Sequence, residues 1–413
     1  MLPDHRGRNM GFLAFTWRQL VLLTVLSFLS LSIVGLVVLL HKSMHISVSD
    51  VQKSHGFRGG SRGIKYTRLI LGDAAGEGLA GRVQCTGLYS ASSNTSTGGN
   101  EESCSLSKAK SILFITFFMP LNDAPDKGSR TNAFKLRNST IIKLDLPYAI
   151  LSVYFKSIQM SNSGCLMSIL TGRNANILTR RLPEGVDIVR IPQNFTRSNL
   201  MLQRLESYAY FLGELIEINL QSDTHVDNLE HIVFMDSDII VVGDLKCLFD
   251  VYRDFDIALT FRNNKDQPIN SGFIAVRGEV ASLSRARAFL LEVVNVYKER
   301  FVKAARMLGD QLSLAHIIQE HSKKINLRFR KPSIFMSQIS QSQVLFLPSQ
   351  IYNWTPSEGA GQFHGMPENV KVIHFKGSRK RLMLEAWNEF IQSGSLVDMQ
   401  CLILKSGRTK YDF

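Results

Sequence analysis

The chain has 413 residues, roughly two to three average domains, of which 45% are hydrophobic and 20% are charged. This composition is typical of globular proteins and excludes a collagen, a coiled coil and a wholly disordered chain. Lys and Arg outnumber Asp and Glu by 48 to 35, for a net charge of +13, but the basic residues are scattered. No arginine-rich arm, zinc-finger spacing or RNA-binding aromatic motif accompanies them. An anionic small substrate accounts for the charge equally well, and we expect no nucleic-acid partner.

The first element along the chain is an uncharged apolar segment, Leu20–Leu40, between Arg18 and Lys42. A helix of this length spans a hydrocarbon core of about 30 Å, so the sequence predicts one transmembrane helix. A signal peptide usually has a shorter apolar core, and a buried helix of a soluble domain would show polar positions at helical spacing. A slight excess of basic residues before the segment places residues 1–19 in the cytosol and the bulk of the chain in the lumen.

Glycosylation sequons and cysteines bear on that topology. The sequons begin at Asn94, Asn138, Asn194 and Asn353, although such triplets also arise by chance. The five cysteines, Cys85, Cys104, Cys165, Cys247 and Cys401, fit no zinc or redox motif. A Cys85–Cys104 bridge is one open pairing, and an odd thiol would remain. Residues 41–108 are rich in Gly, Ser and Thr, which predicts a flexible stem.

Short apolar runs follow the stem, with amphipathic segments between several of them. We expect strands at Ser111–Phe118, Cys165–Leu170, Val186–Ile191, His231–Met235, Ile257–Phe261, Gly272–Val276, Val344–Leu347 and Val370–Phe375. We expect helices at Leu146–Gln159, Leu200–Glu217, Ser282–Arg306 and Gln311–Glu320. Strands that are apolar throughout predict an α/β domain whose mostly parallel sheet is covered on both faces. We place this domain at residues 109–395, before a C-terminal tail at 396–413.

Ligands bind such sheets at the carboxyl ends of the strands, and one predicted strand ends there in an acidic pair. His231–Met235 runs directly into Asp236, Ser237 and Asp238. In an extended segment, residues i and i+2 point the same way, so the two carboxylates would face one point. A cation would offset their repulsion, and oxygen ligands suit Mg²⁺ or Mn²⁺. Asp-x-Asp alone is a weak signal, because it also occurs in turns and helix caps.

A second polar segment, His374–Lys380, follows the predicted strand near residue 370. His374 can supply a nitrogen ligand to the same metal, Gly377 lets the backbone approach an anion, and Lys380 with Arg379 or Lys376 can neutralise phosphate. The alternative without a function is a solvent-exposed basic turn after an edge strand.

Together these segments resemble nucleotide-sugar transferases of the GT-A type, in particular glycosyltransferase family 8, the class of glycogenin, galactinol synthase and plant xylan glucuronosyltransferases. The resemblance covers about residues 200–385. It rests on four stretches: Phe234–Asp250, Pro268–Phe273, Gly309–Leu312 and His374–Lys380.

The resemblance implies a Rossmann-like GT-A fold and assigns roles by position. Asp236, Asp238 and His374 would hold Mn²⁺ or Mg²⁺ against the diphosphate of a nucleotide sugar, with Ser237 between the carboxylates. Gly377 and Lys380 would bind the diphosphate. Arg204 and Gly272 would also bind the donor, and its sugar would be faced by Asn270, Ser271, Asp310 and Gln311, with Asp310 or Gln311 nearest the reacting carbon. Asp310 is the candidate nucleophile, whereas Gln311 would favour front-face attack.

The sequence departs from the family pattern in two places: at Ser237, where relatives most often carry Ala, and in the N-terminal nucleotide-binding segment. Ser111–Gly128 matches that segment poorly, and Phe117, Phe118 and Asp123 are its candidate base contacts. The choice of UDP therefore rests on the resemblance.

The resemblance and the topology together predict a single-pass type II glycoprotein of the Golgi or ER membrane. It would transfer a sugar to a glycan or other acceptor with retention of configuration. A non-catalytic GT-A-fold binding protein is the first alternative. The second is a phosphatase of the haloacid dehalogenase type, which also places Asp-x-Asp after an apolar strand but usually nearer the start of its domain.

Overall fold

The computed structural model describes residues 69–86, 111–120, 133–136, 140–142, 145–196, 198–221, 230–264, 266–304, 307–321, 325–356 and 364–406. All of them belong to the unit Ile64–Phe413. The predicted transmembrane segment at 20–40 lies outside these ranges. Within the ranges, no helix combines the length and apolar character that a membrane crossing needs.

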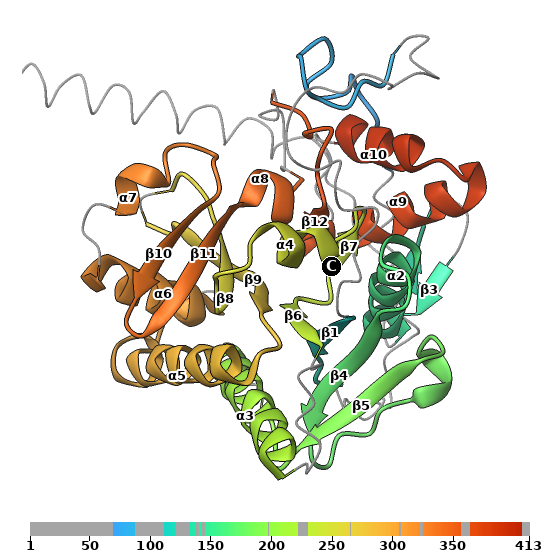
Figure 1. Ribbon diagram of the computed structural model, residues 1–413. Helices are drawn as coiled ribbons and strands as arrows, with labels where there is room; N and C mark the ends of the chain where they lie inside the picture. The colour runs from blue at the N-terminus through green and yellow to red at the C-terminus, as the bar shows by residue number, and fades with distance from the viewer. Residues whose placement is uncertain are drawn as a thin grey trace, which may run out of the picture. The chain divides into compact units, whose positions relative to one another are not determined.

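The main element of the described part is an eight-stranded sheet with the order β10-β11-β8-β9-β6-β1-β4-β5 (Figure 1). Its strands are β1 Ile112–Phe117, β4 Leu166–Gly172, β5 Val186–Ile191, β6 His231–Met235, β8 Ile257–Phe261, β9 Ile269–Val276, β10 Phe335–Ile339 and β11 Ser342–Pro348. Strands β6, β1, β4 and β5 form a parallel block, and β11 is parallel to β8. Strand β9 is antiparallel to both β6 and β8, and β10 to β11. The prediction of a mostly parallel α/β sheet is therefore confirmed.

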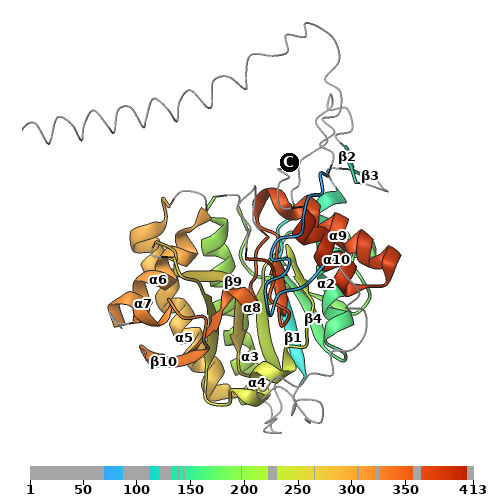
Figure 2. The ribbon, with the colours of Figure 1, turned by 90° about the horizontal axis from the view of Figure 1, so that it is seen from above.

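Helices cover both faces of this sheet, with α3, α5 and α6 on one side and α2, α9 and α10 on the other (Figure 2). The helices are α2 Leu146–Ser161, α3 Leu200–Gln221, α4 Lys246–Val251, α5 Val280–Val296, α6 Gly309–His321, α7 Ile325–Arg328, α8 Ser349–Tyr352, α9 Lys380–Ser393 and α10 Leu396–Lys405. In β6, Val233 and Met235 enter the core that α2 covers, whereas Ile232 and Phe234 enter the core that α3 covers. A central strand is apolar throughout because both of its faces are buried.

Two small sheets complete the described part. Strand β7 (Ile239–Val241) pairs antiparallel with β12 (Val372–His374), and β2 (Ala133–Lys135) pairs antiparallel with β3 (Thr140–Ile142). Strand β7 follows β6 directly along the chain, and its pairing with β12 brings Val372–His374 next to Ile239–Val241.

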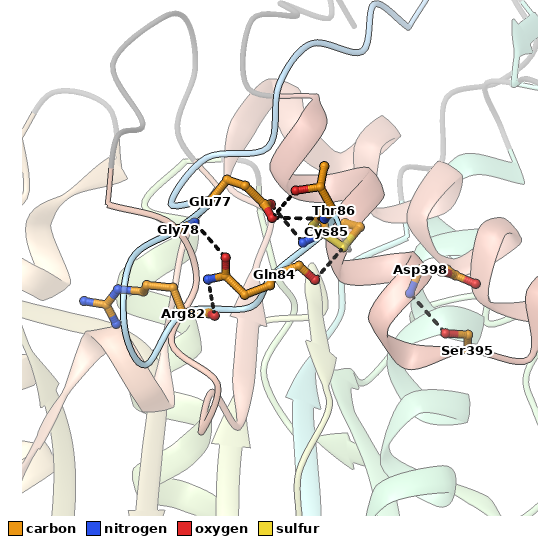
Figure 3. The surroundings of a disulfide bond; sticks show 9 residues. Glu77, Gly78, Arg82, Gln84, Cys85, Thr86, Ser395 and Asp398 are labelled. Carbon is orange, nitrogen blue, oxygen red and sulfur yellow. Dashed lines mark hydrogen bonds between the residues drawn. A yellow bond between two sulfur atoms is a disulfide. The ribbon is translucent and has the colours of Figure 1, made fainter. Parts of the chain in front are cut away.

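The segment 69–86 is held to the C-terminal part of the domain, whereas the sequence predicted a flexible stem there. Cys85 forms a disulfide with Cys401 of α10, not with Cys104, and the Gly72 amide donates to the Lys405 carbonyl at 2.8 Å. Glu77 accepts from the backbone amides of Cys85 and Thr86 (Figure 3). Helix α10 is packed on α9 through buried apolar side chains, so the expected tail at 396–413 begins with a helix of the core.

Candidate functional site

The acidic pair lies at the carboxyl end of β6, in a bend before β7. The Asp236 amide donates to the Gly272 carbonyl of the neighbouring β9 at 3.1 Å, which fixes the start of the bend. The two residues are therefore not in an extended strand as the sequence predicted. Their carboxylates nevertheless approach a common point, because the chain turns there into β7.

Pairing of β12 with β7 brings His374 to this bend. His374 lies opposite Ile239 in the pairing, and the Phe375 amide donates to the Asp238 carbonyl at 2.8 Å. One ligand atom from each of Asp236, Asp238 and His374 lies within 4.8 Å of the others. The predicted metal-ligand set thus converges in the structure, from segments 136 residues apart.

The contacts of the two carboxylates are divided between their oxygens. Asp236 Oδ1 accepts from Arg204, while its Oδ2 lies 3.5 Å from His374 Nε2. Asp238 Oδ2 lies 2.9 Å from Lys380 Nζ, and its Oδ1 lies 3.1 Å from the same His374 nitrogen. Burial would raise the pKa of Asp238, but Lys380 and His374 outweigh it and hold that pKa well below its ordinary value.

A second group of predicted residues surrounds the guanidinium of Arg204. Arg204 comes from α3, is 3% exposed, and donates to Asp236, to Asp310 and to Ser271 Oγ, the last at 2.9 Å. Ser271 in turn donates to Asp310 Oδ2 at 2.6 Å. Burial lowers the pKa of Arg204, but the carboxylates with Tyr208 raise it further, so this side chain stays charged.

Asp310, the candidate nucleophile, is itself buried in this group. It lies in the first turn of α6, is 1% exposed, and its Oδ1 accepts from the Gln311 amide at 2.8 Å. Burial raises the pKa of Asp310, against the opposing effects of Arg204 and Ser271. The Gln311 side chain is only half-buried, and its Oε1 accepts from Asn270 Nδ2 at 3.4 Å.

The glycines of the site provide room for its side chains. A Cβ on Gly272 would lie 2.5 Å from His374 Cε1, so only glycine lets the ring approach β9 this closely. Gly377 has a positive φ of 59° and opens the turn that leads to Lys380 at the start of α9, with nothing within 4 Å of a Cβ placed there. Ser237 lies half-buried in the bend between the acidic residues.

Two residues near the site, Asn353 and Thr260, were not predicted, and a third, Lys376, was named only as an alternative partner of Lys380. Asn353 and Thr260 lie behind His374 and Asn270 and are almost fully buried. Burial and the Arg262 guanidinium lower the pKa of Lys376 to about 8, and the acidic pair acts in the opposite direction. The motif His374–Lys380 had indicated Lys376, whereas Asn353 was marked in the sequence only as part of a glycosylation sequon.

The candidate nucleobase contacts are dispersed. Phe117 packs against Phe195 in a tilted arrangement, and Phe118 packs edge-on against Tyr148, both as parts of the core or its margin. Asp123 lies outside the described residues. Phe117 and Phe118 therefore belong to different apolar clusters and do not form a common base-binding group.

Comparison with known proteins leaves the family open. No family model matches the sequence, and no curated protein matches it. Among solved structures, the chain is similar to the crystal structure of a glycosyltransferase involved in the glycosylation of the major capsid of PBCV-1. The identity is 10% and the TM-score 0.36, over 67% of this chain and 99% of that chain. A likeness at this level decides neither family nor activity.

Proposed function

We propose that the protein is a metal-dependent glycosyltransferase that moves a sugar from a nucleotide-diphosphate sugar, most simply a UDP-sugar, to a glycan or other acceptor with retention. The observation that supports this best is the convergence of Asp236, Asp238 and His374 at the carboxyl ends of the strands, with Lys380 beside them. These are the positions at which the resemblance to glycosyltransferase family 8 expects the metal and the diphosphate.

The donor atoms fit a divalent cation of this kind. Two carboxylates and one imidazole suit Mn²⁺, and Mg²⁺ is the alternative. Such a cation, when bound, neutralises charge that develops on the departing diphosphate. Lys380 adds a positive charge next to the same carboxylates, and the open backbone at Gly377 leaves room for an anion.

Asp310 and Gln311 take different roles in this proposal. Because both oxygens of Asp310 are engaged and its side chain is buried, Asp310 orients Arg204 and the start of α6. Gln311 is the more exposed of the two and contacts Asn270, so it is the residue that faces the donor sugar. This favours front-face attack over a covalent intermediate on Asp310.

The cellular setting is part of the proposal. The apolar segment 20–40 would anchor the chain as a type II protein of the Golgi or ER membrane, with the domain in the lumen. The Cys85–Cys401 disulfide supports an oxidising compartment.

The test is a donor screen with the full-length chain in detergent and Mn²⁺, following release of free nucleotide. Asp236→Asn and Asp238→Asn should each lower the rate at least about 100-fold, because the charge of the leaving group loses its stabilisation. Asp187→Asn, on an exposed position of the edge strand β5, is the matched control and should not change it.

Full activity in both site variants would overturn the site assignment. Release of phosphate from a phosphoester, with no nucleotide released from any sugar donor, would favour the haloacid dehalogenase-type alternative. Mn²⁺-dependent UDP binding without turnover would favour a non-catalytic binding protein.

A further inference from the structure

Asn353 lies directly behind the imidazole of His374, on the side away from the acidic pair. It follows the short helix α8, where its own amide donates to the Ser349 carbonyl at 3.1 Å. Its side chain is 3% exposed, and Asn353 Oδ1 lies 2.8 Å from His374 Nδ1. The same residue therefore sits in the core and touches a predicted metal ligand.

The amide nitrogen of Asn353 has two oxygen acceptors. Its Nδ2 donates to Asn270 Oδ1 at 2.7 Å and to Thr260 Oγ1 at 3.0 Å. The Thr260 hydroxyl donates its own hydrogen to the Asn270 carbonyl at 3.0 Å, so toward Asn353 it can only accept. Asn270 Oδ1 also accepts from the Gly272 amide at 2.9 Å.

This arrangement fixes which way the amide of Asn353 faces. If the amide were reversed, its oxygen would face the Asn270 oxygen with no hydrogen between them, at a site closed to water. The oxygen of Asn353 must therefore face His374, and the hydrogen between them must be carried by His374 Nδ1. A neutral imidazole that carries its hydrogen on Nδ1 presents a lone pair at Nε2.

We propose that Asn353 is a positioning residue, which holds His374 in the Nδ1–H tautomer and so presents Nε2 to a divalent cation between Asp236 and Asp238. Ligating histidines commonly donate their other ring N–H to a fixed acceptor, and loss of such an acceptor typically lowers metal affinity or activity about 10–100-fold. The inference rests on the proposed metal site. It also gives Asn353 a second task, because the bond to Asn270 couples the metal ligand to the residue that contacts Gln311.

The positioning role of Asn353 differs from the role that its sequence motif indicates. Asn353-Trp354-Thr355 is a glycosylation sequon. In the folded chain its amide nitrogen is buried and bonded to two oxygens, and the Trp354 carbonyl accepts from the His374 amide at 2.7 Å. The segment is therefore part of the support of His374.

The test compares Asn353→Leu with Asn353→Asp in the metal-free, full-length chain, titrated with Mn²⁺ alone and followed by electron paramagnetic resonance. Asn353→Leu should lose about 10–100-fold in affinity, because no acceptor is left for the ring. Asn353→Asp should bind Mn²⁺ within about threefold of the parent chain, because burial favours the protonated carboxyl group, whose one oxygen accepts from the ring while the other donates to Asn270 Oδ1. Asn162→Ala is the control: Asn162 is an equally buried asparagine that bonds the Leu245 amide, and its loss should lower stability only.

The second readout is the tautomer of His374 itself, from ¹⁵N chemical shifts of a histidine-labelled chain, assigned by comparison with His374→Gln. The parent chain should show hydrogen on Nδ1, and Asn353→Leu a mixture. If that variant does not fold, Asn353→Ala tests the same point, since it removes the same acceptor without adding a larger apolar side chain and should also mix the tautomers.

Three outcomes separate the claims. Unchanged Mn²⁺ affinity and unchanged tautomer in folded Asn353→Leu would overturn the inference, as would loss of affinity in both variants with the tautomer retained. A parent chain that binds no Mn²⁺ but whose His374 tautomer depends on Asn353 would refute the proposed metal site and keep the positioning role.

Discussion

Gly272→Ala is the sharpest perturbation of the site, because it acts on His374 without altering any polar group. The new Cβ would lie 2.5 Å from His374 Cε1, 2.8 Å from Nδ1 and 2.9 Å from Asn270 Oδ1. Carbon atoms pack at about 3.5–4.0 Å, so the ring must withdraw by about 1 Å or more. Strand β9 is held here by the bond from the Asp236 amide to the Gly272 carbonyl and by its pairing with β8 before and after the bulge at this position, so the ring is the easier of the two to move.

A shift of this size exceeds what metal coordination tolerates, since ligand distances are held to about ±0.2 Å. We expect Mn²⁺ affinity to fall by at least about 10–100-fold, and folding stability by about 1–3 kcal/mol from overpacking. Isothermal titration with Mn²⁺ and thermal unfolding measure the two effects separately. Gly213→Ala in α3 is the control: its Cβ would meet only the mobile end of Arg287, at 2.9 Å. A folded Gly272→Ala chain that binds Mn²⁺ as well as the parent would refute the reasoning.

Three further measurements address the remaining contacts. Cys401→Ser should lower the free energy of unfolding in urea by about 2–5 kcal/mol, and Cys85→Ser by the same amount, with no further loss in the double variant. In a chain secreted from eukaryotic cells, glycopeptide mass spectrometry should find Asn194, which is exposed, modified and Asn353 unmodified. Lys380→Met removes a charge that lowers the pKa of Asp238. A carboxyl group whose pKa is lower in the folded chain than in the unfolded chain stabilises the fold above the unfolded pKa, and this stabilisation is lost as the pH falls through the folded pKa. Acid unfolding of the metal-free variant, followed by circular dichroism, should therefore begin at a higher pH than in the parent.

The central strands could be predicted from the sequence because burial on both faces leaves a direct trace in composition. β6 and β8 begin and end at the predicted residues, and so does β5, an edge strand in which four of the six residues are apolar. β10 (Phe335–Ile339), at the opposite edge, was missed because only its first and last residues are fully buried and the polar pair Ser337 and Gln338 interrupts its sequence. A continuous apolar run is the signature of a central strand, so a search for such runs passes over a strand with polar residues in its middle.

The C-terminal helices were missed although their boundaries carry local signals. Gly394 ends α9 in the left-handed conformation with φ of 66°, and the Ser395 side chain accepts from the Asp398 amide at the start of α10. The sequence around Gly394 therefore marks the junction of two helices. The link from α10 to Cys85 could not be predicted, because nothing local pairs cysteines 316 residues apart.

The sequence predicted most residues of the candidate site, but not how the chain brings them together. The acidic pair and His374 were identified from their positions after apolar runs, but they meet through the β7–β12 pairing, and β7 was not predicted as a strand. Asn353 could not be identified at all, since a sequon carries no information on burial. Its role follows only from the contacts that the folded chain creates around it.

The division of contacts between carboxylate oxygens explains how the acidic pair is stable before any cation binds. In each carboxylate, a cationic side chain of the chain holds one oxygen: Arg204 holds Oδ1 of Asp236 and Lys380 holds Oδ2 of Asp238. The other two oxygens turn toward His374 Nε2. Arg204 and Lys380 thus offset the repulsion that would otherwise separate two partly buried carboxylates. Three ligand atoms are left facing one point, so a cation can be bound without rearrangement of the residues that fix them.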